Sequence, residues 1–135
     1  MRKVIDQITI PELNEMSNFQ AKLHKDLELE SWARQSIFEI MGNIGSEVNR
    51  TIKWKAKGKN KMWQAAFDRS LELFDISKQL KTLPSSQMRE LCRSREVWCD
   101  YVVGDNEYNS TAENIQRYFD QFAIAARISF VADRS

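Results

Sequence analysis

Residues 31–57 read SWARQSIFEIMGNIGSEVNRTIKWKAK, and this stretch decides the fold because its apolar residues follow a helical period. They recur at spacings of four, three, four and four residues, at Ile37, Met41, Ile44, Val48 and Ile52. Such spacing places them on one face of an amphipathic α-helix. We expect this helix to begin after an N-cap at Ser31 and to end at Gly58, a typical C-terminal stop.

Two glycines, Gly42 and Gly45, lie inside this predicted helix. A glycine in a helix interior costs about 1 kcal/mol relative to alanine, so another factor must favour the small residue at both positions. We expect that factor to be close packing of a neighbouring helix.

Three more helices follow from the same kind of pattern. Apolar periodicity predicts helices over residues 60–83 and 86–103, which Pro84 and Gly104 terminate. The tetrapeptide STAE at residues 110–113 has the form of a capping box and is expected to open a fourth helix. The links between these segments are short, which favours antiparallel neighbours.

The chain is therefore expected to be all-α, an up-and-down four-helix bundle over residues 31–135. Its 135 residues include only 4 Gly and 2 Pro, so a turn-rich β-sandwich or barrel is disfavoured. Residues 1–30 form a predicted N-terminal extension, either an arm or an extra helix that starts near Thr9. The four tryptophans and seven phenylalanines fit either the core of one bundle or an interface between subunits.

Composition also argues against several chemistries. The single histidine, His24, cannot supply a multi-histidine metal site, and the sequence has neither a Gly-rich phosphate loop nor a Ser-centred nucleophile elbow. We therefore expect no catalytic residue, no metal and no cofactor. No apolar run is long enough for a membrane span, and Asp6 interrupts the start where a signal peptide would be apolar, which predicts a cytoplasmic protein. Cys92 and Cys99 are expected to be reduced and to pack in or near the core.

The strongest anomaly is the basic segment, residues 50–61, RTIKWKAKGKNK. It holds six cations and no acid, although the net charge of the chain is only +1. Trp54 and Trp63 lie within or just beyond it and offer stacking surfaces. Clustered cations beside aromatic rings are typical of phosphate and nucleic-acid contacts, although a solvated helix end has the same composition. The candidate binding residues are Arg50, Lys53, Lys55, Lys57, Lys59 and Lys61.

Carboxylates form a second pattern. Asp68, Glu72 and Asp75 follow one face of the helix predicted over 60–83. We expect them to pair with arginines of the next helix, either across the bundle or across a subunit interface. The alternative is an enzyme in which these residues and Glu96 handle a metal or protons.

Four segments together resemble a known family: IFEIMGNIGSEVNRTIKWKAKGK (37–59), FDRSLELFDI (67–76), RSREVWCDYVVGDNEYNST (93–111) and YFDQFAIAAR (118–127). They resemble the accessory variability determinant (Avd) proteins, which are encoded beside reverse transcriptases in bacterial diversity-generating retroelements. The resemblance covers about residues 31–128. It implies a four-helix bundle that assembles into a barrel-like homo-oligomer, a pentamer in the family's known form.

The resemblance also implies a non-enzymatic function. An Avd-like protein binds the reverse transcriptase and its template RNA, or an RNA/DNA form of it, and so supports mutagenic cDNA synthesis and retrohoming. In this chain the basic segment would contact nucleic acid, with Arg89 and Arg93 as further candidates. Avd proteins are strongly basic, whereas this chain carries a net charge of +1, a departure that bears on broad RNA binding more than on partner binding.

A hypothesis from another class is a HEPN-like helical partner or antitoxin. Such a protein would bind a protein such as a nucleotidyltransferase without touching nucleic acid. HEPN ribonucleases use an arginine followed four to six residues later by histidine, and no arginine stands at positions 18–20 ahead of His24. An active nuclease of that type is therefore not expected.

Overall fold

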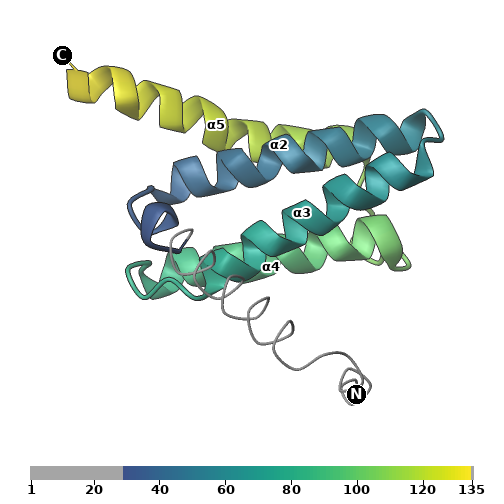
Figure 1. Ribbon diagram of the computed structural model, residues 1–135, viewed down its shortest axis with the longest axis horizontal. Helices are drawn as coiled ribbons and strands as arrows, with labels where there is room; N and C mark the ends of the chain where they lie inside the picture. The colour runs from purple at the N-terminus through teal and green to yellow at the C-terminus, as the bar shows by residue number, and fades with distance from the viewer. Residues whose placement is uncertain (1–28, 135) are drawn as a thin grey trace, which may run out of the picture.

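The structure is a computed structural model that describes residues 29–134, and its regular elements over that range are all helices (Figure 1). They are α2 (Ile37–Ala56), α3 (Asn60–Lys78), α4 (Ser85–Val103) and α5 (Ala112–Arg134), preceded by helical residues 29–32. The all-α class and the helical bundle are therefore confirmed. The predictions for residues 1–28 lie outside the described range.

The helices are arranged in the order α5, α2, α3, α4, and α2 packs against both α3 and α5. Contacts between α2 and α5 pair Gly42 with Ala123 and Gly45 with Phe119, so these two helices are antiparallel. A Cβ atom built on Gly42 would lie 3.3 Å from the Ala123 Cα. The close packing expected at the two glycines is confirmed.

The N-cap of α2 is Ser36, so the predicted cap at Ser31 is wrong. The Ser36 Oγ accepts a hydrogen bond from the Glu39 N–H (3.2 Å), and the Glu39 Oε1 accepts one from the Ser36 N–H (2.9 Å). This reciprocal capping box satisfies two main-chain donors. Ser31 has Arg34 three residues on, which cannot accept a hydrogen bond, and the chain turns over residues 33–36 instead.

The other helix ends differ from prediction by a few residues. Gly58 ends α2 as expected, with a φ of +70° that favours glycine. Helix α3 ends at Lys78, five residues before the predicted boundary. The N-cap of α5 is Thr111, whose Oγ1 accepts from the Asn114 N–H (3.0 Å), so the N-cap predicted at Ser110 is wrong by one residue. The main-chain N–H of Ser110, which a capping box at 110–113 would bond to Glu113, instead donates to the Asn106 Oδ1 (2.8 Å).

The core lies between the four helices and contains most of the predicted apolar stripe. Its fully buried side chains include Ile40, Met41, Ile44, Val48, Phe74, Leu91 and Trp98. The Trp98 Nε1–H donates to the Ser70 Oγ (2.9 Å), and the Ser70 hydroxyl donates to the Phe67 carbonyl (2.5 Å), so this buried polar pair is satisfied. Trp98 is thus a core residue, whereas Trp32, Trp54 and Trp63 are half-buried. Within residues 29–134, no helix has the length and apolar character that a membrane span requires.

Candidate nucleic-acid interface

The basic segment comprises the last residues of α2, the turn over residues 57–59 and the first residues of α3, at one end of the bundle (Figure 1). The Gly58 N–H donates to the Lys55 carbonyl (3.1 Å) and the Lys59 N–H donates to the Trp54 carbonyl (3.0 Å), which closes the turn over three residues. All six cations of the segment are exposed. The structure therefore displays the predicted residues together on the end of α2, the turn and the start of α3.

Three of these lysines lie over tryptophan rings. The Lys53 and Lys57 Nζ atoms lie 4.9 and 5.4 Å from the ring centroid of Trp54. The Lys55 Nζ lies 4.2 Å from the ring centroid of Trp63. These distances are within the range of cation–π attraction. The lysines thus cover the indole surface on which a base would otherwise stack. The role of Trp54 and Trp63 here is to hold the lysine ammonium groups in place.

Two of the six cations also have polar partners inside the fold. The Lys55 Nζ donates to the Val102 carbonyl (3.2 Å) and so ties the basic segment to the C-terminal end of α4, where main-chain carbonyls carry partial negative charge. The Arg50 Nη1 lies 3.0 Å from the Glu47 Oε2. Lys53, Lys57, Lys59 and Lys61 form no ion pair among residues 29–134.

Arg69 of α3 is a neighbouring cation that the sequence patterns did not single out. Its Nε lies 3.1 Å from the Glu47 Oε1, so one carboxylate with a side chain only 13% exposed holds Arg50 and Arg69 side by side. Positions 47 and 69 are equally far from Gly58 along the chain. Two antiparallel helices that are joined at this glycine bring residues equally distant from it side by side. The sequence therefore contains a signal for the proximity of Glu47 and Arg69.

Arg89 and Arg93 do not join the basic segment. Helix α4 rises about 1.5 Å per residue, so Arg93 lies about 14 Å and Arg89 about 20 Å along the axis from Val102, where Lys55 is bound. Arg93 instead lines a cavity between α4 and α5. The eight candidate residues therefore divide into the basic segment and a separate α4 pair.

The acidic line on α3 forms one of the predicted cross-bundle pairs. The Asp75 Oδ1 lies 3.3 Å from the Arg95 Nε, an ion-pair distance, although the two groups are not aligned as a hydrogen bond. Asp68 and Glu72 are exposed and join no ion pair in the described part of the chain. No three His, Cys, Asp or Glu side chains within that part are grouped closely enough to hold a metal ion. Glu96 accepts a hydrogen bond from the Tyr108 hydroxyl (2.5 Å) instead.

An acidic loop, residues 104–111, lies at the same end of the bundle as the basic segment (Figure 1). The Asp100 carboxylate shapes it by accepting from the N–H groups of Glu107 (2.9 Å) and Tyr108 (3.1 Å). Its exposed acids are Asp105 and Glu107. The exposed cations of the basic segment and the exposed acids of this loop thus lie at the same end of the bundle.

The two cysteines occupy different environments. Cys99 is half-buried, and burial raises the pKa of its thiol above the ordinary value. Cys92 is exposed, so its predicted place in or near the core is wrong. It lies on the outer face of α4, one residue after the buried Leu91.

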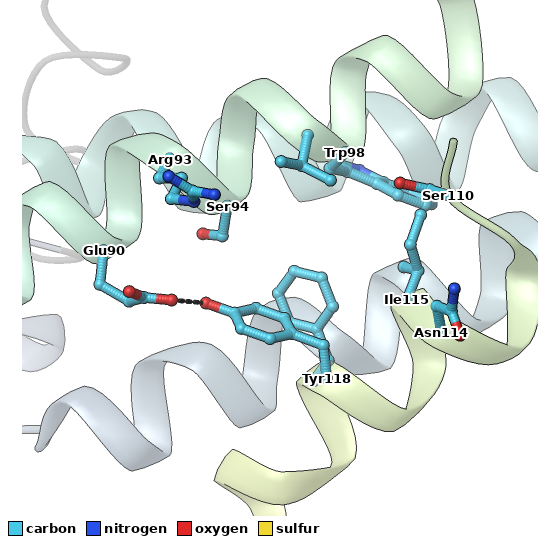
Figure 2. Close-up of a pocket in the computed structure, with 10 residues that line it drawn as sticks. Glu90, Arg93, Ser94, Trp98, Ser110, Asn114, Ile115 and Tyr118 are labelled. Atoms are coloured by element: carbon cyan, nitrogen blue, oxygen red, sulfur yellow. Dashed lines mark hydrogen bonds between the residues drawn. The ribbon is translucent and has the colours of Figure 1, made fainter. Parts of the chain in front are cut away.

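The cavity between α4 and α5 has a volume of about 210 Å3 (Figure 2). Its α4 wall includes Glu90, Arg93 and Ser94, and its α5 wall includes Tyr118. The Tyr118 hydroxyl donates to the Glu90 Oε2 at one end. Burial raises the pKa of Tyr118, and the hydrogen bond to Glu90 raises it further. No sequence pattern indicated this site.

No protein-family model matches this chain, and no curated protein and no solved structure is detectably similar to it.

Proposed function

We propose that this chain is a non-enzymatic cytoplasmic accessory protein that self-associates and binds a reverse transcriptase and its template RNA. The observation that carries the RNA part is the basic segment, where Lys53, Lys57, Lys59 and Lys61 are exposed at and beside the α2–α3 turn without acidic partners in the described range. The reverse transcriptase, the homo-oligomer and the retroelement setting rest on the resemblance to the Avd proteins.

The charges of this turn suit phosphate oxygens rather than base edges. Lysine ammonium groups act as point charges without the fixed geometry that base readout uses. Two of them, on Lys53 and Lys57, are held over Trp54, which reduces the conformational freedom lost on binding. We therefore expect binding that depends on salt and on RNA backbone shape more than on sequence.

The test compares two charge-reversal pairs on the full chain. The first pair is Lys59→Glu with Lys61→Glu. These are the two lysines of the segment whose side chains contact neither a tryptophan ring nor the main-chain carbonyls at the end of α4. Lys78→Glu with Lys81→Glu makes the same charge change at the far end of α3, where both side chains are exposed. Binding of a fluorescent hairpin RNA is measured by anisotropy over a series of salt concentrations.

We expect the first pair alone to weaken RNA binding and to reduce the salt slope by about 0.7–0.9 for each phosphate that the variant no longer neutralises. Circular dichroism and light scattering check that helicity and oligomer size are unchanged. Equal RNA affinity of the two variants would contradict the proposed role of the basic segment.

A second candidate function is a helical partner or antitoxin that binds only protein. It is favoured by exposed apolar side chains, since Phe38, Ile124 and Ile128 are 37%, 48% and 64% exposed. Binding by such residues would change little with salt and would survive the Lys59→Glu and Lys61→Glu changes. Salt response thus separates the two functions.

A further inference from the structure

The cavity between α4 and α5 is separate from the basic segment and has a size suited to a small ligand. Drug-sized ligands occupy pockets of about 300–1,000 Å3. A cavity of about 210 Å3 is smaller and is suited to one planar ring system, such as two fused rings. The cavity lies between two helices that are joined by the acidic loop but pack mainly against α3 and α2. Figure 2 shows the Glu90–Tyr118 hydrogen bond at one end and Trp98, Ser110, Ile115 and Asn114 at the other.

The charged groups of this cavity select a neutral ligand that has both donors and acceptors. Glu90 contributes a carboxylate, whose oxygens accept hydrogen bonds, and Arg93 contributes a guanidinium, which only donates them. Their formal charges cancel. The Glu90 Oε2 accepts from Tyr118, while its Oε1 has no partner among the described residues. The apolar part of the wall comes from Val97 and Trp98 of α4 and from Ile115 and the rings of Tyr118 and Phe119 of α5.

Guanine is the nucleic-acid base that matches these groups. Its N1–H and N2–H donors are adjacent and suit one carboxylate, and its O6 and N7 acceptors suit a guanidinium. Adenine, cytosine and uracil have no two adjacent donor groups on one edge, so a carboxylate that accepts from their one donor group would have its second oxygen beside an acceptor, which it repels. Tyr118 and Phe119 add aromatic surface for the ring of the base.

We propose that the α4–α5 cavity binds a guanine base, with Glu90 accepting from its N1/N2 edge and Arg93 donating to its O6 and N7. The base comes either from a free guanine nucleotide or from an unpaired guanosine in RNA. Trp98, at one end of the cavity, lies one helical turn, about 6 Å, from Val102, where Lys55 of the basic segment is bound. An RNA source rests on the proposed function, whereas a free nucleotide does not.

The first measurement is titration calorimetry of the full chain with GMP, AMP and inorganic phosphate. We expect GMP to bind in the micromolar to millimolar range, AMP to bind at least about tenfold more weakly, and phosphate to give no binding at the same concentrations. Absence of GMP binding, or equal affinity for GMP and AMP, would overturn the proposal.

Two variants locate the site. Glu90→Gln keeps the shape and an acceptor for Tyr118 but removes the charge, so GMP affinity is expected to fall at least about tenfold while AMP affinity stays the same. Val97→Phe fills the cavity, and Val103→Phe makes the same change at a side chain on α4 that is 65% exposed. With helicity unchanged by circular dichroism, GMP binding is expected to be lost in the first and retained in the second. Unaltered GMP binding in both Glu90→Gln and Val97→Phe would overturn the proposed site.

A hairpin RNA with one loop guanosine distinguishes the two sources. Replacing that guanosine by inosine removes the N2 amino group, so lower RNA affinity supports an RNA base in the cavity. Unchanged RNA affinity together with GMP binding supports the free nucleotide. Because Lys59→Glu with Lys61→Glu leaves the cavity intact, this variant is expected to bind GMP normally, which separates failure of the cavity proposal from failure of the proposed RNA function.

Discussion

Gly45 of α2 faces Phe119 of α5 so closely that a Cβ atom at position 45 would lie 2.9 Å from the Phe119 Cβ. The nearest atom belongs to the base of the phenylalanine side chain, which cannot move without its helix. Gly45 therefore sets the distance between α2 and α5.

The first prediction follows from this close approach. Gly45→Ala gains about 1 kcal/mol of helix propensity but forces α5 outward, and overpacking costs about 1–3 kcal/mol. We expect a net loss of up to about 2 kcal/mol in the free energy of unfolding, measured by urea denaturation. Gly42→Ala is the matched control, because its Cβ would lie 3.3 Å from Ala123 and needs a smaller shift. Equal stability of the two variants would contradict the assigned role of Gly45.

The second prediction concerns the buried pair of Trp98 and Ser70. Ser70→Ala leaves the indole N–H without an acceptor, which costs about 1–3 kcal/mol. Trp98→Phe loses the indole and leaves a cavity, so it is also destabilising. Because both changes remove the same hydrogen bond, the double variant is expected to lose less than the sum of the single losses. Additive losses in urea denaturation would show that the hydrogen bond contributes nothing.

The third prediction concerns the pH dependence of stability through Tyr118. Its pKa is raised in the folded protein above the usual value of about 10, so the folded state holds this proton more tightly than the unfolded chain does. The stabilisation is fully present below pH of about 10 and is lost as pH rises toward the folded-state pKa. We expect the difference in free energy of unfolding between the wild type and Tyr118→Phe to shrink above that pH. A constant difference would contradict the raised pKa.

The fourth prediction links Glu47 to RNA binding. Glu47→Gln frees the guanidinium groups of Arg50 and Arg69, so RNA affinity at low salt is expected to rise. Loss of these partly exposed pairs costs stability by no more than about 1 kcal/mol. Glu72→Gln, an exposed carboxylate on α3 outside any ion pair of the described range, is the control for the change in net charge. Anisotropy that rises equally in both variants would assign the effect to net charge alone.

Helix number and the buried face of α2 could be predicted because they depend on local spacing and on breakers such as Gly58 and Pro84. The cap at Ser36 could be predicted in principle, since Glu39 completes its capping box, whereas Ser31 has no such partner. The early end of α3 at Lys78 has no comparable local signal.

The candidate sites depended more on tertiary structure. Exposure of the basic segment follows from its composition, but the bond from Lys55 to Val102 joins residues 47 positions apart and has no local signal. The cavity depends on how far α4 stands from α5, which is set by packing against α3 and α2. Glu90, Arg93 and Tyr118 therefore showed no shared pattern in the sequence.

The contact between Gly45 and Phe119 also has a consequence for the growing chain. These residues are 74 positions apart, so α2 leaves the ribosome well before the helix that covers its glycine face. At a synthesis rate of about 5–20 residues per second, about 4–15 s pass between the addition of Gly45 and the addition of Phe119. The α2–α3 pair, joined by a three-residue turn, forms within this interval, and α5 docks last.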